Sequence, residues 1–221
     1  NIDRNECETL SAGQRAALSV SIGHDDVARG DWLGAAKRSV IRIDTHLTLL
    51  DSAAPLKSGV DYHLHIGAAH RLARVRKLDE NASLYQLSLD EPIACHWGDR
   101  FILRDPAAKF SLGGGKVIDT EVPKRGRASP ERLALLRAYQ NESRAAIEAA
   151  LAVTPYGIAL EQFALVRNLA PAAIDACLEQ ARQQSPAPIE VPIDGARFPR
   201  LFGAPVADSL RELLGRLELC P

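Results

Sequence analysis

The chain has 221 residues and contains no methionine, and its first residue is Asn1. A chain without even an initiating methionine is expected to be a piece of a longer protein. Its first residues lack the apolar stretch of a signal peptide. No run approaches the roughly 18 apolar residues that a membrane helix needs. We therefore expect no secretion signal and no contact with a membrane.

Cysteine is scarce and scattered. The four cysteines are Cys7, Cys95, Cys177 and Cys220. Their separations exclude the closely spaced pairs of a sequence-local zinc knuckle. So few thiols in a chain of this length favour a reducing compartment, so we predict a cytoplasmic protein.

The motifs of several common enzyme classes are also missing. The sequence contains no GxxxxGK[ST] phosphate loop, no GxSxG nucleophile elbow and no HExxH zinc motif. The run from Gly113 to Lys116 is rich in glycine, but it is too short for a phosphate loop. We expect it to mark a close approach or a bulge next to a barrel strand. The chain itself is not predicted to be an enzyme.

Charge of either sign is balanced, with 27 basic and 28 acidic residues and a net charge of -1. No global positive field therefore indicates nucleic acid, although local basic clusters can still bind it. One cluster lies on and beside a predicted strand, and a second lies in a predicted linker and just after it. They contain Arg71, Arg74, Arg76 and Lys77, then Lys124, Arg125 and Arg127 followed by Arg132 and Arg137. The alternative is a solvated face paired with neighbouring acids such as Asp79 and Glu80.

Three histidines lie close together in the sequence. His63 and His65 are two residues apart on a predicted strand, so both point to one face, about 6.6–6.8 Å apart along it. His70 follows soon after. A metal site built on this pair would need a third ligand, and no carboxylate follows before Asp79. Contact with solvent or RNA is the favoured interpretation.

The first half of the chain predicts short strands between turns. Alternating apolar and polar residues over 60–66 give a clear period of two. Residues 79–82 are expected to form a hairpin loop. Strands of this length with little helix between them indicate an antiparallel barrel or sandwich. The predicted strands cover residues 15–20, 40–44, 60–66, 72–78, 83–89, 100–103 and 115–120.

The second half predicts helices and a small wing. Residues 121–128 form a basic linker, after which Ser129 and Pro130 make a helix start, with serine as the N-cap and proline at the first position. Alternation over 189–193 and a turn at Asp194 and Gly195 indicate a two-stranded wing. Together these elements predict a winged-helix module, with residues 159–182 as the helix-turn-helix. The predicted helices cover residues 130–140, 142–153, 159–168, 171–182 and 205–217.

Several short motifs, in this order, resemble the bacterial selenocysteine-specific translation elongation factors. Gly13 to Leu18 and the RGDWL turn at 29–33 are similar to the end of the second domain of that family. Residues 63–70 resemble a third-domain strand and turn. Gly98 to Asp105 resembles a hairpin that elongation factor Tu also carries. A winged helix then follows, whereas elongation factor Tu ends after its third domain.

The resemblance implies a fold and a domain order. It implies a mixed fold class: an elongation-factor-type antiparallel β-barrel followed by an α+β winged-helix domain. Residues 1–34 would be the C-terminal part of the domain II barrel and residues 37–120 the domain III barrel. Residues 121–128 would be the linker and 129–221 the winged helix. The GTPase domain would be absent from this chain.

The resemblance also implies function and sites. The chain would bind selenocysteinyl-tRNA and connect the GTPase body to winged helices that read the mRNA selenocysteine-insertion hairpin on the ribosome. Arg15 would bind the aminoacyl group, since a fixed guanidinium suits a selenolate and not a serine hydroxyl. Cofactors would be absent here, with GTP and magnesium in the missing domain, no metal in this chain, and a monomeric state. The tRNA-binding candidates are His70, Arg71, Arg74 and Arg76.

Two rival functions remain open from the residues alone. A DNA-binding regulator could join a barrel sensor to a winged helix. Its recognition helix, 171–182, is nevertheless poor in the side chains that read base edges and carries two acids. A metal-dependent barrel enzyme using His63 and His65 is the other rival.

Overall fold

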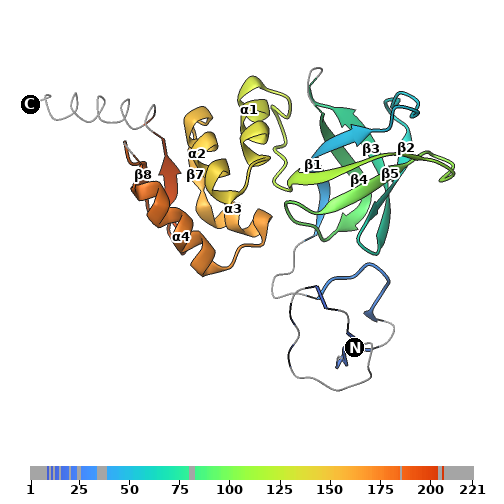
Figure 1. Ribbon diagram of the computed structural model, residues 1–221, viewed down its shortest axis with the longest axis horizontal. Helices are drawn as coiled ribbons and strands as arrows, with labels where there is room; N and C mark the ends of the chain where they lie inside the picture. The colour runs from blue at the N-terminus through green and yellow to red at the C-terminus, as the bar shows by residue number, and fades with distance from the viewer. Residues whose placement is uncertain are drawn as a thin grey trace, which may run out of the picture.

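The computed structural model describes most of the chain between residues 39 and 203 and short stretches before it. In Figure 1 the strands of a barrel lie at one side and the helices at the other, with helix α1 (Pro130–Tyr139) nearest the barrel. No helix in the described part of the chain is long and apolar enough to cross a bilayer. The described residues are 9, 11, 13–14, 16–19, 21–23, 26–33, 39–79, 83–184, 186–203 and 206.

The barrel is a closed antiparallel sheet in which β1 pairs with both β4 and β6. Closure satisfies the backbone groups that an open sheet would leave at its edges. The order around the barrel is β1-β4-β3-β2-β5-β6. The strands are β1 Val40–Leu49, β2 Asp61–Ile66, β3 Ala69–Lys77, β4 Leu84–Ile93, β5 Arg100–Arg104 and β6 Ser111–Asp119.

Alternation in the sequence becomes alternation of burial. Along β2, Tyr62, Leu64 and Ile66 point into the core, while His63 and His65 lie between them on the outer face. Residues 60–66 were predicted as a strand on this pattern, and that prediction is confirmed. The barrel core is therefore built from one residue in two along each strand, and the outer face is left for polar side chains.

The glycine run lies on β6, where it passes close to β1 and β5. A Cβ on Gly113 would lie 2.3 Å from the Thr48 carbonyl oxygen, and one on Gly115 would lie 2.0 Å from that of His46. Both distances are impossible for a side-chain carbon, so these positions require glycine. The predicted close approach beside a barrel strand is confirmed.

Two sequence expectations for the first half need comment. Ala16 to Ser19 were predicted within a strand, but these described residues form none, and no strand pairs with them to complete a ladder. The hairpin loop at 79–82 lies partly outside the described residues, although β3 and β4 do pair antiparallel on either side of it. The assignment of residues 1–34 to an upstream barrel stays a prediction.

The helical module, defined as α1 to β9, begins at the predicted helix start. The Ser129 side chain accepts a hydrogen bond from the Arg132 backbone amide, and Pro130 occupies the first turn. The cap and the proline thus act as predicted. The helices are α1 Pro130–Tyr139, α2 Ser143–Val153, α3 Leu160–Arg167 and α4 Pro171–Arg182.

A three-stranded sheet completes the module in the order β7-β9-β8. The expected wing is formed by β8 Ile189–Val191 and β9 Arg200–Phe202, while β7 Ile158–Ala159 was not predicted. Asn168 ends α3 in the left-handed conformation (φ 50°) and turns the chain toward α4. This arrangement agrees with the predicted α+β winged-helix fold; the helix expected at 205–217 lies outside the described residues except for Val206.

Candidate nucleic-acid interface

The four predicted tRNA-binding residues all lie on β3. His70, Arg74 and Arg76 occupy alternate positions with Leu72, so they share the outer face of the barrel, and all three are exposed. Arg71 is half-buried on the strand's opposite register. The structure therefore brings three of the predicted residues onto one face and sets the fourth apart.

The arginines of β3 differ in how free their charges are. Arg71 donates to the carbonyl oxygens of His70 (2.7 Å) and Pro92 (3.2 Å), so its guanidinium serves the barrel itself. Arg74 pairs with Asp61 at 2.8 Å, and both side chains are well exposed. An exposed pair of this kind contributes about 0–1 kcal/mol to stability, so little stability would be lost if a phosphate took the place of the carboxylate. The Arg76 side chain makes no hydrogen bond or ion pair with any described residue, which leaves its charge the most available of the three.

His63, His65 and His70 form a stack across β2 and β3, here named the histidine stack. The His63 and His65 rings lie 4.9 and 4.8 Å from the His70 ring, nearly parallel to it. His63 Nδ1 and His70 Nε2 are 2.6 Å apart. Burial lowers the pKa of the His65 imidazole, and the positive charges of His70, Arg104 and His63 lower it further. RNA bases stack on aromatic rings of this kind, although two neighbouring rings already stack on that of His70.

The histidine stack does not have the geometry of a metal centre. Within the described part of the chain, no group of three or more histidine, cysteine or acidic side chains is arranged to hold a metal ion. The second ring nitrogen of His63, Nε2, lies within hydrogen-bond distance of the Pro106 carbonyl oxygen, at 3.3 Å. The rival hypothesis of a metal-dependent enzyme therefore finds no support in this arrangement. Arg15, predicted to bind the aminoacyl group, lies outside the described residues and stays a prediction.

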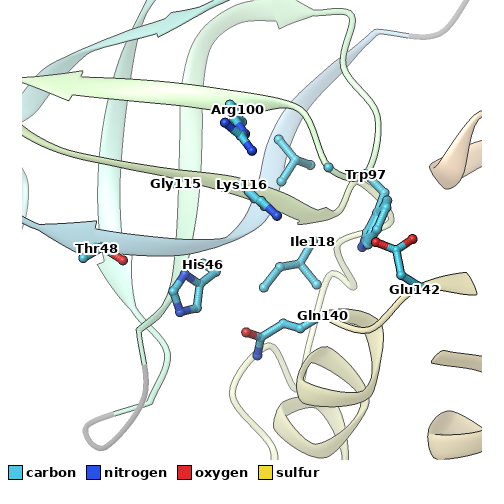
Figure 2. A pocket seen from close by; sticks show the side chains of 11 residues that line it. His46, Thr48, Trp97, Arg100, Gly115, Lys116, Ile118, Gln140 and Glu142 are labelled. Carbon is cyan, nitrogen blue, oxygen red and sulfur yellow. The ribbon is translucent and has the colours of Figure 1, made fainter. Parts of the chain in front are cut away.

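A pocket with a volume of about 460 Å³ lies between the barrel and the helical module, and we name it the junction pocket (Figure 2). In Figure 2, His46, Lys116 and Arg100 rise from the barrel side, and Gln140 and Glu142 approach from the helices. The pocket was not found from the sequence. Its lining is His46, Thr48, Trp97, Gly98, Arg100, Gly115, Lys116, Val117, Ile118, Gln140 and Glu142.

Arg132 has a different role from the one its neighbours in the sequence implied. It was grouped with residues that could neutralise phosphates, but its side chain is only 9% exposed and lies in the junction between barrel and module. It donates to Asp44 at 2.5 Å and to Asp119 at 2.9 Å. The expectation was wrong because the two carboxylates, on β1 and β6, are brought to Arg132 only by the closed barrel. These three residues are named the Asp44–Arg132–Asp119 triad, and Gln86 donates a further hydrogen bond to Asp44 at 2.9 Å.

The charges of this triad do not cancel. Burial raises the pKa of Asp119, and Asp44 adds to the rise, although Arg132 opposes it. Burial alone would lower the pKa of Arg132, but Asp119 and Asp44 together raise it. Two carboxylates share one guanidinium, so one of them is under-compensated in a place with little water. The triad joins the barrel to the helical module, and the strength of this connection depends on the protonation of its carboxyl groups.

Trp97 makes a second contact between the barrel and the helical module. It comes from the loop between β4 and β5, and its indole nitrogen donates to the Tyr139 carbonyl oxygen at 2.7 Å. The Arg167 guanidinium lies 4.0 Å from the Trp97 ring centroid and also donates to that same carbonyl oxygen at 2.8 Å. Burial lowers the pKa of Arg167 to about 10. Stacking on the ring keeps this buried cation in place.

Comparison with known proteins supplies the family context. The family model described as "Selenocysteine-specific elongation factor, beta-barrel domain" matches residues 43–124. A selenocysteine-specific elongation factor of Escherichia coli (strain K12) is 31% identical over 170 residues, which is 73% of this chain and 26% of that protein. One of Haemophilus influenzae (strain Rd) is 29% identical over 133 residues, 57% of this chain and 21% of that protein.

The fold is found in a solved structure as well. The crystal structure of a bacterial selenocysteine-specific elongation factor matches 83% of this chain and 28% of its own, with a TM-score of 0.53 and 16% identity. At that identity the likeness concerns the fold alone. The chain spans about a quarter of the length of the curated relatives it matches.

Proposed function

Residues 43–124 match the model of the β-barrel domain of selenocysteine-specific elongation factors, and from that premise we propose that the chain holds selenocysteinyl-tRNA. In the whole factor it would also join a GTP-binding body to winged helices that read an mRNA hairpin on the ribosome. The chain does no chemistry itself in this proposal, and GTP and magnesium act in another domain. The work is cytoplasmic and requires no membrane.

The observation that carries the proposal is the outer face of β3. It presents His70, Arg74 and Arg76 on one face, with Leu72 between the first two, on a strand whose opposite face contributes to the barrel core. A rigid strand with cations at alternate positions can follow the phosphates of an A-form stem, which proteins recognise by shape and backbone. The nearby histidine stack adds a flat, polar surface.

Rigid connection to the module supports the linking role. The Asp44–Arg132–Asp119 triad and the Trp97–Arg167 contact both join barrel to helices. Apolar packing of Leu136 on α1 against Leu84 and Ile118 of the barrel closes the same junction. Two separate polar locks over a packed interface favour a fixed angle between the parts, which a mechanical connector needs.

The side chains of α4 argue against the rival function of a DNA-binding regulator. Its exposed side chains include Asp175 and Glu179, and the one basic residue, Arg182, is engaged by Glu190 at 2.6 and 2.8 Å. A recognition helix needs free donors for base edges in the major groove. This helix therefore presents a surface unsuited to DNA.

The proposal is tested with the full-length factor that contains this chain. We expect GTP-dependent affinity for selenocysteinyl-tRNA to exceed affinity for the same tRNA carrying serine, and Arg15→Ala to reduce that preference. The double change R74Q/R76Q should weaken both tRNA complexes alike, because phosphates are common to them. The charge-matched control is K57Q/R144Q, at exposed positions outside β3. Equal affinity for both aminoacyl groups, with no dependence on GTP, would refute the proposed function.

A further inference from the structure

Three basic residues form a continuous row across the wall of the junction pocket. Lys116 on β6 lies directly opposite His46 on β1 in one ladder and directly opposite Arg100 on β5 in the other. We name these three residues the basic row. Like charges directly opposite each other on neighbouring strands destabilise a sheet. The facing Lys116 and Arg100 charges therefore destabilise the sheet unless a negative group lies on them.

The protein does not provide that negative charge among its described residues. His46, Arg100 and Lys116 form no ion pair with a described carboxylate, whereas Arg74, Arg137 and Arg182 each do. Glu142 is the single acidic side chain among the residues that line the pocket, and it forms no ion pair with the row. Unneutralised cations in a hollow with protein walls concentrate positive potential there.

The pocket has the size and the groups to receive an anion. Its volume of about 460 Å³ lies within the usual range of ligand pockets, roughly 300–1,000 Å³. Thr48 and Gln140 add neutral hydrogen-bonding groups at its edge, and Gly98 and Gly115 have no side chain to fill it. Figure 2 shows the Lys116 and Arg100 side chains on one wall, with His46 beside them and Gln140 across the hollow.

We propose that the junction pocket binds the phosphate backbone of an RNA strand, with Lys116 and Arg100 neutralising its phosphates and His46, Thr48 and Gln140 as hydrogen-bonding partners. Neighbouring strands lie about 4.7–4.9 Å apart, so the row extends over roughly 9–10 Å. That length exceeds a single phosphate and suits successive phosphates of one strand. The choice of RNA as the polyanion rests on the proposed function, but the site is separate from β3 and would be a second point of contact.

The test compares two charge-matched double variants of the chain. R100Q/K116Q removes two cations of the row, and K57Q/R144Q removes two exposed cations elsewhere. Binding of a fluorescein-labelled RNA stem-loop that carries no amino acid is followed by anisotropy at several salt concentrations. We expect R100Q/K116Q to bind about tenfold more weakly, with a log–log salt slope smaller by about 1.4–1.8, since each of the two lost phosphate contacts lowers that slope by about 0.7–0.9. The K57Q/R144Q variant should resemble the unaltered chain.

Tryptophan fluorescence locates the binding. The chain has two tryptophans, so Trp32→Phe leaves Trp97, which lines the pocket, as the reporter. The RNA should change the Trp97 emission in this background, and not when R100Q/K116Q is added. Inorganic phosphate at matched ionic strength is the second ligand; an equal response to it would mean that the pocket takes free anions and would overturn the RNA assignment. Equal RNA binding by both double variants would overturn the site itself.

These outcomes are independent of the proposed function. The stem-loop carries no selenocysteine and the assay contains no GTP, so loss of binding in R100Q/K116Q says nothing about aminoacyl discrimination. A factor that fails to distinguish selenocysteine from serine could still show this pocket effect. Conversely, a factor that does distinguish them could show none, and the two proposals would then separate.

Discussion

Replacing Arg132 by methionine should destabilise the chain strongly, because it removes the only cation of a buried triad. Asp44 is fully buried and Asp119 is 2% exposed, so water cannot replace the lost guanidinium. Methionine keeps much of the side-chain volume and isolates the loss of charge. Breaking a buried ion pair from one side typically costs about 3–5 kcal/mol. Two carboxylates are left here, so we expect about 4 kcal/mol or more at neutral pH.

The pH dependence follows from the raised pKa of Asp119. A carboxyl whose pKa is higher in the folded state than in the unfolded state binds its proton more readily when folded. Its favourable contribution is therefore complete at low pH and is lost as pH rises through the folded pKa. Arg132 opposes this rise in pKa, so its removal moves the pKa of Asp119 further up. The deficit of R132M relative to the unaltered chain should therefore be larger at about pH 8 than at about pH 5.

Urea unfolding, followed by circular dichroism and tryptophan fluorescence at both pH values, measures this deficit. A matched variant, D44N/D119N/R132M, removes all three charges; it should recover much of the lost stability, since the cost lies in uncompensated charge. An R132M deficit under about 1 kcal/mol at both pH values would refute the argument that the triad locks the junction. So would a deficit that grows on acidification.

Three further predictions concern the barrel and its junction. Gly115→Ala should lower the free energy of unfolding in urea by about 1–3 kcal/mol or more, because the new Cβ would lie 2.0 Å from a backbone oxygen. Ser111→Ala on the same strand should change it by no more than about 0.5 kcal/mol, and equal effects of the two substitutions would contradict the close-approach reasoning. Trp97→Phe should cost about 1 kcal/mol by losing the hydrogen bond to Tyr139, and an unchanged urea midpoint would contradict it. His65 has a lowered pKa, so its contribution to stability should be lost as pH falls below about 6.5. His65→Gln should flatten the decline in melting temperature between about pH 7 and pH 5, and an identical pH profile would count against a neutral, partly buried imidazole.

The elements that the sequence predicted well are those whose signals are local. Alternation over residues 60–66 needs only a half-buried strand to explain it, and Ser129 with Pro130 needs only the geometry of a helix start. Both signals are complete within a few residues, so the structure reproduces them. The strand β7 escaped prediction because two residues carry no periodicity, and it exists only through its pairing with β9.

In the candidate site too, features with a local sequence signal could be predicted, and features that depend on distant residues could not. The β3 face could be predicted from the spacing of Arg74 and Arg76, since side chains two apart share a face. The role of Arg132 could not, because Asp44 is 88 residues away from it in the sequence. The basic row was hidden for the same reason: His46, Arg100 and Lys116 meet only when β6 closes the barrel against β1 and β5. No sequence window contains such a register.

The loop between β4 and β5 holds two aromatic contacts on consecutive residues. His96 meets the Trp32 ring edge-on, with centroids 6.0 Å apart, and Trp97 reaches into the helical module. His96 and Trp97 are consecutive in this loop but contact different parts of the protein. The length of the loop therefore determines whether both contacts can form at once. A single inserted residue between His96 and Trp97 would move one ring away from its partner while leaving every side chain intact. In this loop, natural variation should therefore preserve spacing more strictly than chemistry, and a swapped residue should be tolerated better than an added one.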